Sequence, residues 1–189
     1  MGARTEASSK TSENTAPFAN RTIALVGLMG AGKSTVGRRL AGALGRAFCD
    51  SDEEIELAAG LSIADIFALH GEAEFRRGEK RVLERLLAAP PHVLATGGGA
   101  YLDPDTRKLM REQAITVWLN ADLETLWERV NKRNHRPLLK NPDARGILTR
   151  LLEERKPIYS KADLVVDSMD GPHSATVKKI ITALKGWTP

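Results

Sequence analysis

The segment from residue 27 to residue 34 has the composition and spacing of a loop that binds phosphate groups. It reads Gly-Leu-Met-Gly-Ala-Gly-Lys-Ser and matches the pattern G-x-x-x-x-G-K-[ST]. Its glycines allow the backbone to wrap closely around an anion and to direct N–H groups at phosphate oxygens. In such loops the lysine, here Lys33, reaches the β- and γ-phosphates, and the hydroxyl, here of Ser34, binds Mg²⁺. The sequence therefore predicts that this chain binds a nucleoside triphosphate.

Two carboxylates, Asp50 and Asp52, follow a second short apolar run at residues 47–49. If the segment is extended, side chains two residues apart point to the same side. One carboxylate can then serve a metal ion while the other faces an acceptor hydroxyl. The alternative is that the acidic cluster begins a helix, where carboxylates interact favourably with the helix dipole. A position after a strand favours a function in ligand binding.

A run of three glycines, Gly97, Gly98 and Gly99, follows a third apolar run at residues 92–96. Larger ATPases usually carry a metal-binding aspartate at the end of such a strand, and none stands here. A switch GTPase would need the guanine-specifying tetrapeptide N-K-x-D, which does not occur in the sequence. The sequence therefore favours a kinase that acts on a small molecule.

Apolar runs and amphipathic segments alternate along the chain, which indicates a doubly wound parallel sheet with helices on both faces. The expected strands lie at residues 22–27, 47–49, 92–96, 114–119 and 164–166. The expected helices are 33–44, two short ones ending at Gly60 and Gly71, then 72–89, 104–111, 123–133, 144–156 and 174–184. In such sheets ligands bind beyond the carboxyl ends of the strands, which is where the phosphate loop, the two aspartates and the three glycines fall.

Several further motifs occur in a fixed order along residues 20–185, and together with the phosphate loop they resemble the signature blocks of shikimate kinases. They are Asp50-Ser-Asp52, Ser62-Ile-Ala-Asp-Ile-Phe67, Gly71-Glu-Ala-Glu-Phe75-Arg76, Thr96-Gly-Gly-Gly99, Arg136-Pro-Leu-Leu139 and Arg155-Lys-Pro-Ile-Tyr159. The resemblance implies a three-layer P-loop fold with a five-stranded parallel sheet and a mobile lid at about residues 131–144. It also implies ATP-dependent phosphorylation of shikimate to shikimate 3-phosphate, a step of chorismate and aromatic amino acid biosynthesis.

The resemblance also implies roles for single residues. The loop residues that bind ATP are Gly30, Ala31, Gly32, Lys33, Ser34 and Thr35, together with Arg129 against adenine and Arg136 from the lid. Mg²⁺ is expected at Ser34 and Asp50. The residues expected to bind shikimate are Asp52 at its hydroxyls, Arg76 and Arg155 at its carboxylate, and Gly97, Gly98 and Gly99 through their backbone. Lys33, Asp52 and Arg136 are the expected catalytic residues, and a register error of one residue would exchange Arg76 with Arg77.

Composition sets limits on partners and location. The 189 residues carry a net charge of +4, with 24 acidic residues interspersed among 28 basic ones and no basic stripe with interleaved aromatics, so no nucleic-acid partner is expected. One cysteine excludes an internal disulfide, and no apolar run approaches the roughly 20 residues of a membrane span. We expect a cytoplasmic monomer of one domain at residues 21–186, with a disordered extension at residues 1–20. The four histidines show no metal spacing and are expected on the surface.

Two other functions fit part of the sequence. A kinase for another polyhydroxy acid, such as gluconate, would also use arginines to hold a carboxylate, although gluconate kinases carry a histidine-containing block after the second strand and this chain does not. A kinase-like binding domain without catalysis is the other alternative. Intact Lys33, Ser34, Asp50 and Asp52 argue against it.

Overall fold

The architecture is that of a three-layer α/β domain, seen in a computed structural model that describes residues 18–132, 141–168 and 171–188. Its strands are β1 (Thr22–Val26), β2 (Phe48–Asp50), β3 (Val93–Ala95), β4 (Ala114–Asn120) and β5 (Leu164–Asp167). Its helices are α2 (Lys33–Leu44), α3 (Ser51–Ala59), α4 (Ile63–Leu87), α5 (Pro104–Gln113), α6 (Leu123–Asn131), α7 (Ala144–Tyr159) and α8 (His173–Lys185), with a 3₁₀ turn η1 at Ala100–Leu102.

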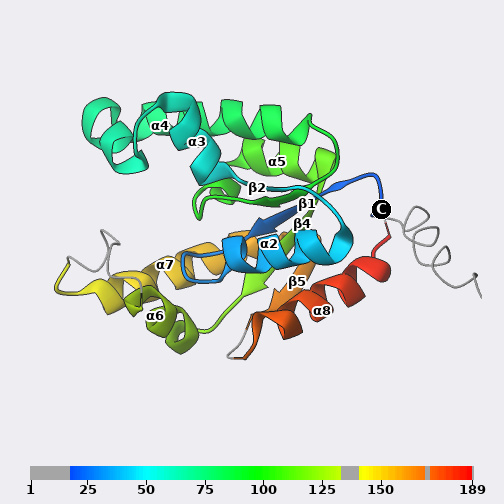
Figure 1. Cartoon of the computed structure of the whole chain (residues 1–189). Helices are drawn as coiled ribbons and strands as arrows, with labels where there is room; N and C mark the ends of the chain where they lie inside the picture. The colour runs from blue at the N-terminus through cyan, green and yellow to red at the C-terminus, as the bar shows by residue number, and fades with distance from the viewer. Residues whose placement is uncertain (1–17, 133–140, 169–170, 189) are drawn as a thin grey trace, which may run out of the picture.

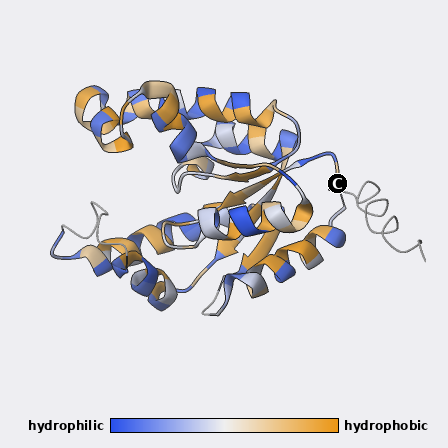
Figure 2. Ribbon diagram, viewed as in Figure 1, coloured by the Kyte–Doolittle hydropathy of each residue, from blue (hydrophilic) through white to orange (hydrophobic). Residues whose placement is uncertain are grey.

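The five strands form one parallel sheet in the order β2-β3-β1-β4-β5. Helices α2 and α8 pack on each other over one face, in front of the sheet in Figure 1, and α5 packs behind it against β4. The residues of β1 are all buried, and β4 is buried up to its last residue, which is the pattern of strands covered on both faces. Figure 2 shows these strands as largely hydrophobic. The predicted five-stranded parallel sheet is confirmed.

The helix boundaries follow local signals at most positions. Gly45 and Gly60 end α2 and α3 in the left-handed conformation that glycine adopts without steric cost. Ser62 begins α4 by accepting a hydrogen bond from the N–H of Asp65. The predicted helix end at Gly71 is also confirmed, because the backbone of this glycine is not helical (φ 77°, ψ 174°) and α4 consists of two helices that meet there at a kink.

The carboxyl ends of β1, β2 and β3 lie side by side, since β3 pairs with both of the other strands. The phosphate loop follows β1, α3 follows β2, and the glycine triplet follows β3. Three segments far apart in the sequence therefore meet at one edge of the sheet. Within the described residues, no helix is long and apolar enough to cross a membrane.

Candidate active site

The phosphate loop is a turn whose glycines take conformations that residues with side chains rarely adopt. Gly27, Gly30 and Gly32 have φ angles of 138°, 85° and 91°. A Cβ on Gly27 would also lie 2.9 Å from the carbonyl oxygen of Leu119. The loop leads directly into α2, so its N–H groups and the helix dipole favour an anion at the same point. The Nζ atom of Lys33 donates to the carbonyl oxygens of Gly27 (2.7 Å) and Leu28 (3.1 Å), which holds the ammonium over the loop.

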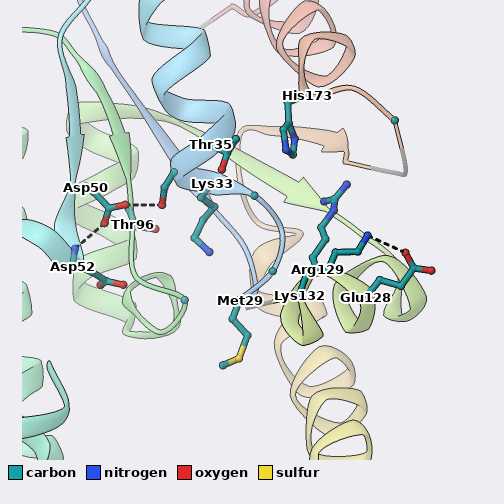
Figure 3. Close-up of a pocket in the computed structure, with 15 residues that line it drawn as sticks. Met29, Lys33, Thr35, Asp50, Asp52, Thr96, Glu128, Arg129, Lys132 and His173 are labelled. Carbon is teal, nitrogen blue, oxygen red and sulfur yellow. Dashed lines mark hydrogen bonds and ion pairs between the residues drawn. The ribbon is translucent and has the colours of Figure 1, made fainter. Parts of the chain in front are cut away.

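Asp50 links the phosphate loop to the next strand end. It is the last residue of β2 and is 8% exposed. One carboxylate oxygen accepts a hydrogen bond from the hydroxyl of Ser34 (2.6 Å), and the other caps α3 by accepting from the N–H of Asp52 (3.1 Å), as Figure 3 shows. Ser34 and Asp50 thus present oxygen atoms together at the start of α2.

These two oxygen-bearing side chains suit Mg²⁺, which prefers oxygen ligands and usually takes only one or two carboxylates from a protein. In the described part of the chain, no three His, Cys, Asp or Glu side chains gather in a way that would hold a metal by themselves. A cation at Ser34 and Asp50 would therefore depend on phosphate oxygens and water for its remaining ligands.

Asp52 lies in the first turn of α3, which corrects the expectation that it shares an extended segment with Asp50. The chain turns into the helix at Ser51 because Asp50 caps it and acids fill its first turn. Both aspartates still line one cavity. Burial, and then the charge of Asp50, raise the pKa of Asp52 from 3.8 to about 6, while Lys33 opposes this shift. Asp52 therefore binds a proton more tightly in this site than a carboxylate in water does.

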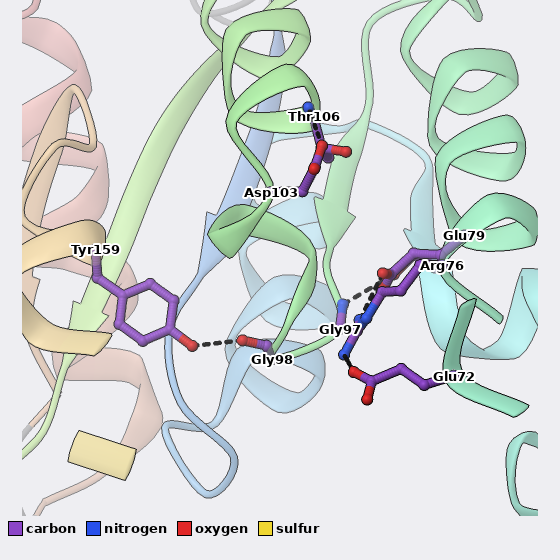
Figure 4. A network of polar contacts seen from close by, with 9 residues as sticks. Glu72, Arg76, Glu79, Gly97, Gly98, Asp103, Thr106 and Tyr159 are labelled. Atoms are coloured by element: carbon purple, nitrogen blue, oxygen red, sulfur yellow. Dashed lines mark hydrogen bonds and ion pairs between the residues drawn. The ribbon is translucent and has the colours of Figure 1, made fainter. Parts of the chain in front are cut away.

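The glycine triplet packs between α3, α4 and α7. The N–H of Gly97 donates to the hydroxyl of the fully buried Ser51 (2.9 Å). A Cβ on Gly97 would lie 2.7 Å from a carboxylate oxygen of Asp52 and 3.1 Å from one of Glu79. The carbonyl oxygen of Gly98 accepts a hydrogen bond from the hydroxyl of Tyr159 (Figure 4). These contacts place the backbone of the triplet directly beside Asp52.

Arg76 and Arg77 have different surroundings. A Cβ on Gly99 would lie 2.6 Å from both terminal nitrogens of Arg76, so this guanidinium reaches the glycine triplet. It donates to Glu79 at 2.6 Å and, more weakly, to Glu72 at 3.4 Å (Figure 4). The side chain of Arg77 is exposed and pairs with Glu74. The geometry therefore places Arg76, and not its neighbour, beside the other candidate substrate residues.

Glu79 was missed in the sequence and is 4% exposed. Burial raises the pKa of its carboxyl, although Arg76 lowers it. The sequence could have indicated this burial, because Glu79 lies on the helical face that also carries Phe75, Val82 and Leu83. A carboxylate among apolar residues needs a charged or hydrogen-bonding partner. Arg76, three residues earlier on the same helix, is that partner.

Tyr159 and Arg155 lie one turn apart on α7. Tyr159 is buried, and burial raises the pKa of its hydroxyl while Arg155 lowers it. Arg155 is half-buried, and through Tyr159 its turn of α7 is joined to Gly98. Tyr159 is the last residue of one of the sequence motifs. Its hydrogen bond to Gly98 joins residues 61 positions apart, so no local sequence pattern could predict it.

A cavity of about 430 Å³ lies over the phosphate loop and extends to the two aspartates and to Gly98. The predicted site residues that line it are Gly30, Gly32, Lys33, Ser34, Thr35, Asp50, Asp52, Gly98 and Arg129. Ala31, also a loop residue, is buried, and Arg76, Gly97, Gly99 and Arg155 lie outside this lining. Arg136 and most of the predicted lid lie outside the described residues. At the end away from the aspartates, the guanidinium of Arg129 donates to the hydroxyl of Ser168 (3.2 Å), which donates to the carbonyl of Ala31 (3.1 Å).

Comparison with known proteins gives a consistent set of relatives. A family profile described as "Shikimate kinase" matches residues 29–185. A shikimate kinase of Caulobacter vibrioides is 53% identical over 174 residues, which are 92% of this chain and 87% of that protein. One of Paramagnetospirillum magneticum is 57% identical over 164 residues, covering 87% of this chain and 84% of that protein.

Solved structures agree with the sequence relatives. The shikimate kinase of Acinetobacter baumannii in complex with shikimate superposes with a TM-score of 0.84 at 38% identity, over 89% of this chain and 95% of that one. A gluconokinase of Sinorhizobium meliloti reaches a TM-score of only 0.59 at 21% identity, over 87% of this chain and 91% of that one. The likeness to the gluconokinase is one of fold alone.

Proposed function

The chain belongs to the shikimate kinase family, and from this premise we propose how its residues carry out the reaction. The protein transfers the γ-phosphoryl group of ATP to a hydroxyl of shikimate, giving shikimate 3-phosphate and ADP. The observation that supports the residue roles best is that the phosphate loop and Asp52 line the same cavity. The glycine triplet adjoins both substrate candidates, with Asp52 at Gly97 and Arg76 at Gly99. A donor phosphate and an acceptor hydroxyl can therefore meet without a change in the sheet.

ATP binds with its phosphate chain in the loop. Backbone N–H groups of residues 30–35 hold the phosphates, and the ammonium of Lys33 exchanges its bonds to loop carbonyls for bonds to phosphate oxygens. Ser34 and Asp50 would hold Mg²⁺, which would supply positive charge to the phosphate oxygens. The guanidinium of Arg129 lies toward the nucleoside. Phosphoryl transfer requires in-line positioning and neutralisation of charge more than covalent chemistry, and these residues provide both.

Shikimate binds between α3, α4 and α7. Arg76 and Arg155 bind its carboxylate through charge-assisted hydrogen bonds, and the backbone of the glycine triplet contacts the ring. Asp52 accepts a hydrogen bond from the reacting hydroxyl of shikimate and so orients the hydroxyl oxygen toward the γ-phosphorus. As the new P–O bond forms and the bond to the β-phosphate oxygen breaks, the hydroxyl proton passes to Asp52.

The proposal also includes the organisation of the protein. Residues 21–186 form one domain, and the protein works as a monomer in the cytoplasm. Arg136 and the segment at about residues 131–144 close over the phosphates as a lid. The proposal of a lid rests on the sequence motifs, since residues 133–140 lie outside the described residues.

A coupled assay of ADP release with shikimate and with gluconate as acceptors tests the proposed function. We expect turnover with shikimate and only background release with gluconate, because the arrangement suits a ring whose carboxylate and hydroxyls lie at opposite ends. Lys33→Ala serves as the catalytically impaired control. Turnover with gluconate, or none with either acceptor, would contradict the proposal.

Gly97→Ala is expected to lower kcat/KM for shikimate by about 10- to 100-fold. An added Cβ would press on the carboxylates of Asp52 and Glu79, and small displacements of reacting groups change rates by this order of magnitude. The φ angle at Gly97 is not in the left-handed region, so the effect would come from space alone. Steady-state kinetics measures it.

Gly78→Ala is the matched control for this substitution. Gly78 lies on α4, and apart from the neighbouring backbone of the helix itself no heavy atom stands within 4 Å of an added Cβ there. Alanine at this helical position should leave kinetics unchanged and raise stability by about 0.5–1 kcal/mol. Equal kinetics for the two variants would show that Gly97 does not need to be small.

A further inference from the structure

The glycine triplet has backbone hydrogen-bond donors to spare but no unpaired carbonyl group. Its three carbonyl oxygens accept hydrogen bonds, in chain order, from the N–H of Ala100 (3.2 Å), the hydroxyl of Tyr159 and the N–H of Leu102 (3.0 Å). The N–H of Gly97 donates to Ser51. The N–H groups of Gly98 and Gly99 donate to no group in the described part of the chain. The triplet can therefore donate to a ligand from these two positions.

Tyr159 holds the middle carbonyl group of the triplet from the end of α7. The side chain is 1% exposed, and its ring stacks on Trp118 of β4 with 6.1 Å between the ring centroids. Packing on both sides of the ring leaves the hydroxyl a fixed position. Figure 4 shows Tyr159 on one side of the triplet and Arg76 on the other. The hydrogen bond to Gly98 therefore pulls that carbonyl group away from Arg76.

This hydrogen bond fixes the direction of the peptide group between Gly98 and Gly99. The peptide is trans, so its carbonyl group and its N–H point in opposite directions. With the carbonyl turned toward Tyr159, the N–H of Gly99 points away from α7. The guanidinium of Arg76 lies on that side and adjoins Gly99. The N–H and the guanidinium can therefore donate to the same anionic group.

The reverse orientation of this peptide is sterically open to two neighbouring glycines. Rotating the peptide by half a turn would move the φ angle of Gly99 from −95° to a positive value, which glycine adopts without steric cost. The reversed peptide would turn its carbonyl oxygen toward Arg76, where it would repel a carboxylate. It would also leave the buried hydroxyl of Tyr159 without its acceptor. The hydrogen bond from Tyr159 thus favours the orientation that presents the N–H.

We propose that Tyr159 is a positioning residue for shikimate, whose hydroxyl holds the peptide between Gly98 and Gly99 with its N–H, and not its carbonyl oxygen, toward the bound carboxylate. The inference rests on the proposed function, because it takes the carboxylate of shikimate to lie at Arg76. Tyr159 acts through the triplet and does not touch the substrate. Its hydroxyl therefore affects how tightly shikimate binds and leaves the nucleotide site unchanged.

Steady-state kinetics of Tyr159→Phe in the full-length protein tests the proposal. The substitution keeps the ring and its stacking on Trp118 and removes only the hydroxyl. We expect the KM for shikimate to rise about three- to tenfold, the range that corresponds to one hydrogen bond. The KM for ATP and kcat should change little, because the lost interaction serves binding of shikimate alone.

Tyr101→Phe is the matched control. Tyr101 is a fully buried tyrosine in η1, directly after the triplet, and its hydroxyl has no hydrogen-bond partner among the described residues. Removing this hydroxyl should leave the kinetics unchanged. Equal effects of the two substitutions, or equal rises in the KM for shikimate and for ATP in Tyr159→Phe, would show that Tyr159 only supports the fold and would overturn the proposal.

Arg155 is the other route by which Tyr159 could act, since it lies one turn earlier on α7. Introducing Tyr159→Phe into the Arg155→Ala protein separates the two routes. We expect a further loss of kcat/KM for shikimate, because the triplet remains to be misoriented when Arg155 is absent. No further loss would overturn the role of the triplet.

The inference and the proposed function fail in different ways. Wild-type kinetics for Tyr159→Phe, in a protein that phosphorylates shikimate, would overturn the role of Tyr159 and leave the proposed function intact. Absence of shikimate phosphorylation by the wild-type protein would contradict the proposed function, and the inference with it.

Discussion

Asp52→Asn is expected to lower kcat by about 10²–10⁴-fold, the range associated with loss of a positioned proton acceptor. The substitution keeps the size of the side chain and its capacity for hydrogen bonds but removes the charge and the site that receives the hydroxyl proton. A loose, metaphosphate-like transition state needs little base catalysis, so part of the loss would come from poorer orientation of the acceptor oxygen. Steady-state kinetics and calorimetric binding of shikimate measure the two contributions separately.

The outcome distinguishes the possible roles of the residue. Loss of kcat with retained shikimate binding identifies Asp52 as a base, and a raised KM with a modest fall in kcat identifies it as a positioning group. Values near wild type in both parameters would remove Asp52 from the site. Glu53→Gln is the matched control, because Glu53 is the next residue of α3 and pairs with Arg38 away from the cavity. It should leave the kinetics unchanged.

Asp52→Asn should also stabilise the protein in the absence of ligands. The pKa of Asp52 is raised from 3.8 to about 6 by burial and by Asp50, so the folded state binds a proton there more tightly than the unfolded state. Ionised Asp52 therefore destabilises the fold above about pH 6, and this penalty disappears as the pH falls from about 6 to 3.8. After allowance for partial exposure, Asp52→Asn should gain about 1–3 kcal/mol at pH 8 and progressively less below pH 6.

Urea unfolding of both proteins at pH 8 and pH 4.5 measures this difference. A gain in stability together with a loss of activity is what a functional carboxylate held beside a second carboxylate should give. Asp52→Asn proteins less stable than wild type at pH 8 would show that the carboxylate is held by favourable contacts, and would contradict the raised pKa.

Local patterns in the sequence were sufficient for the sheet and the phosphate loop. Buried parallel strands read as short apolar runs, and the loop carries its glycines at fixed spacing, so both can be recognised within about ten residues. The end of β2 was less certain. The acids after it suit a helix start as well as a strand end, and the capping of α3 by Asp50 decides in favour of the helix.

Contacts between distant segments could not be predicted in the same way. The bond from Tyr159 to Gly98 and the approach of Glu79 to Gly97 depend on how α7 and α4 pack around the loop after β3. His173 was expected on the surface as a residue without metal spacing, yet the position of α8 beside α2 brings it to the phosphate loop. His92 was also expected on the surface. It is 2% exposed because it stands just before β3, where its ring lies 3.4 Å from the hydroxyl of Thr22 at the start of β1.

Arg76→Ala is expected to raise the KM for shikimate by about 10- to 150-fold, with a much smaller effect on the KM for ATP. The estimate follows from loss of one charge-assisted interaction with the substrate carboxylate, worth about 1.5–3 kcal/mol. Arg155→Ala should act in the same direction. Arg77→Ala should have little effect, because Arg77 is exposed and pairs with Glu74 away from the glycine triplet. The opposite ranking of Arg76 and Arg77 would show that the substrate carboxylate binds on another face of α4.

Arg76→Ala should also destabilise the protein, because it leaves the buried carboxylate of Glu79 without its 2.6 Å partner. We expect a loss of about 1–3 kcal/mol, less than for a fully buried pair because Arg76 is partly exposed. Adding Glu79→Gln removes the uncompensated charge, so the double variant should recover stability while its KM for shikimate stays high. Thermal unfolding and steady-state kinetics on the four proteins of this cycle separate the two effects. Recovery of KM together with stability in the double variant would show that Arg76 only neutralises Glu79 and does not bind the substrate.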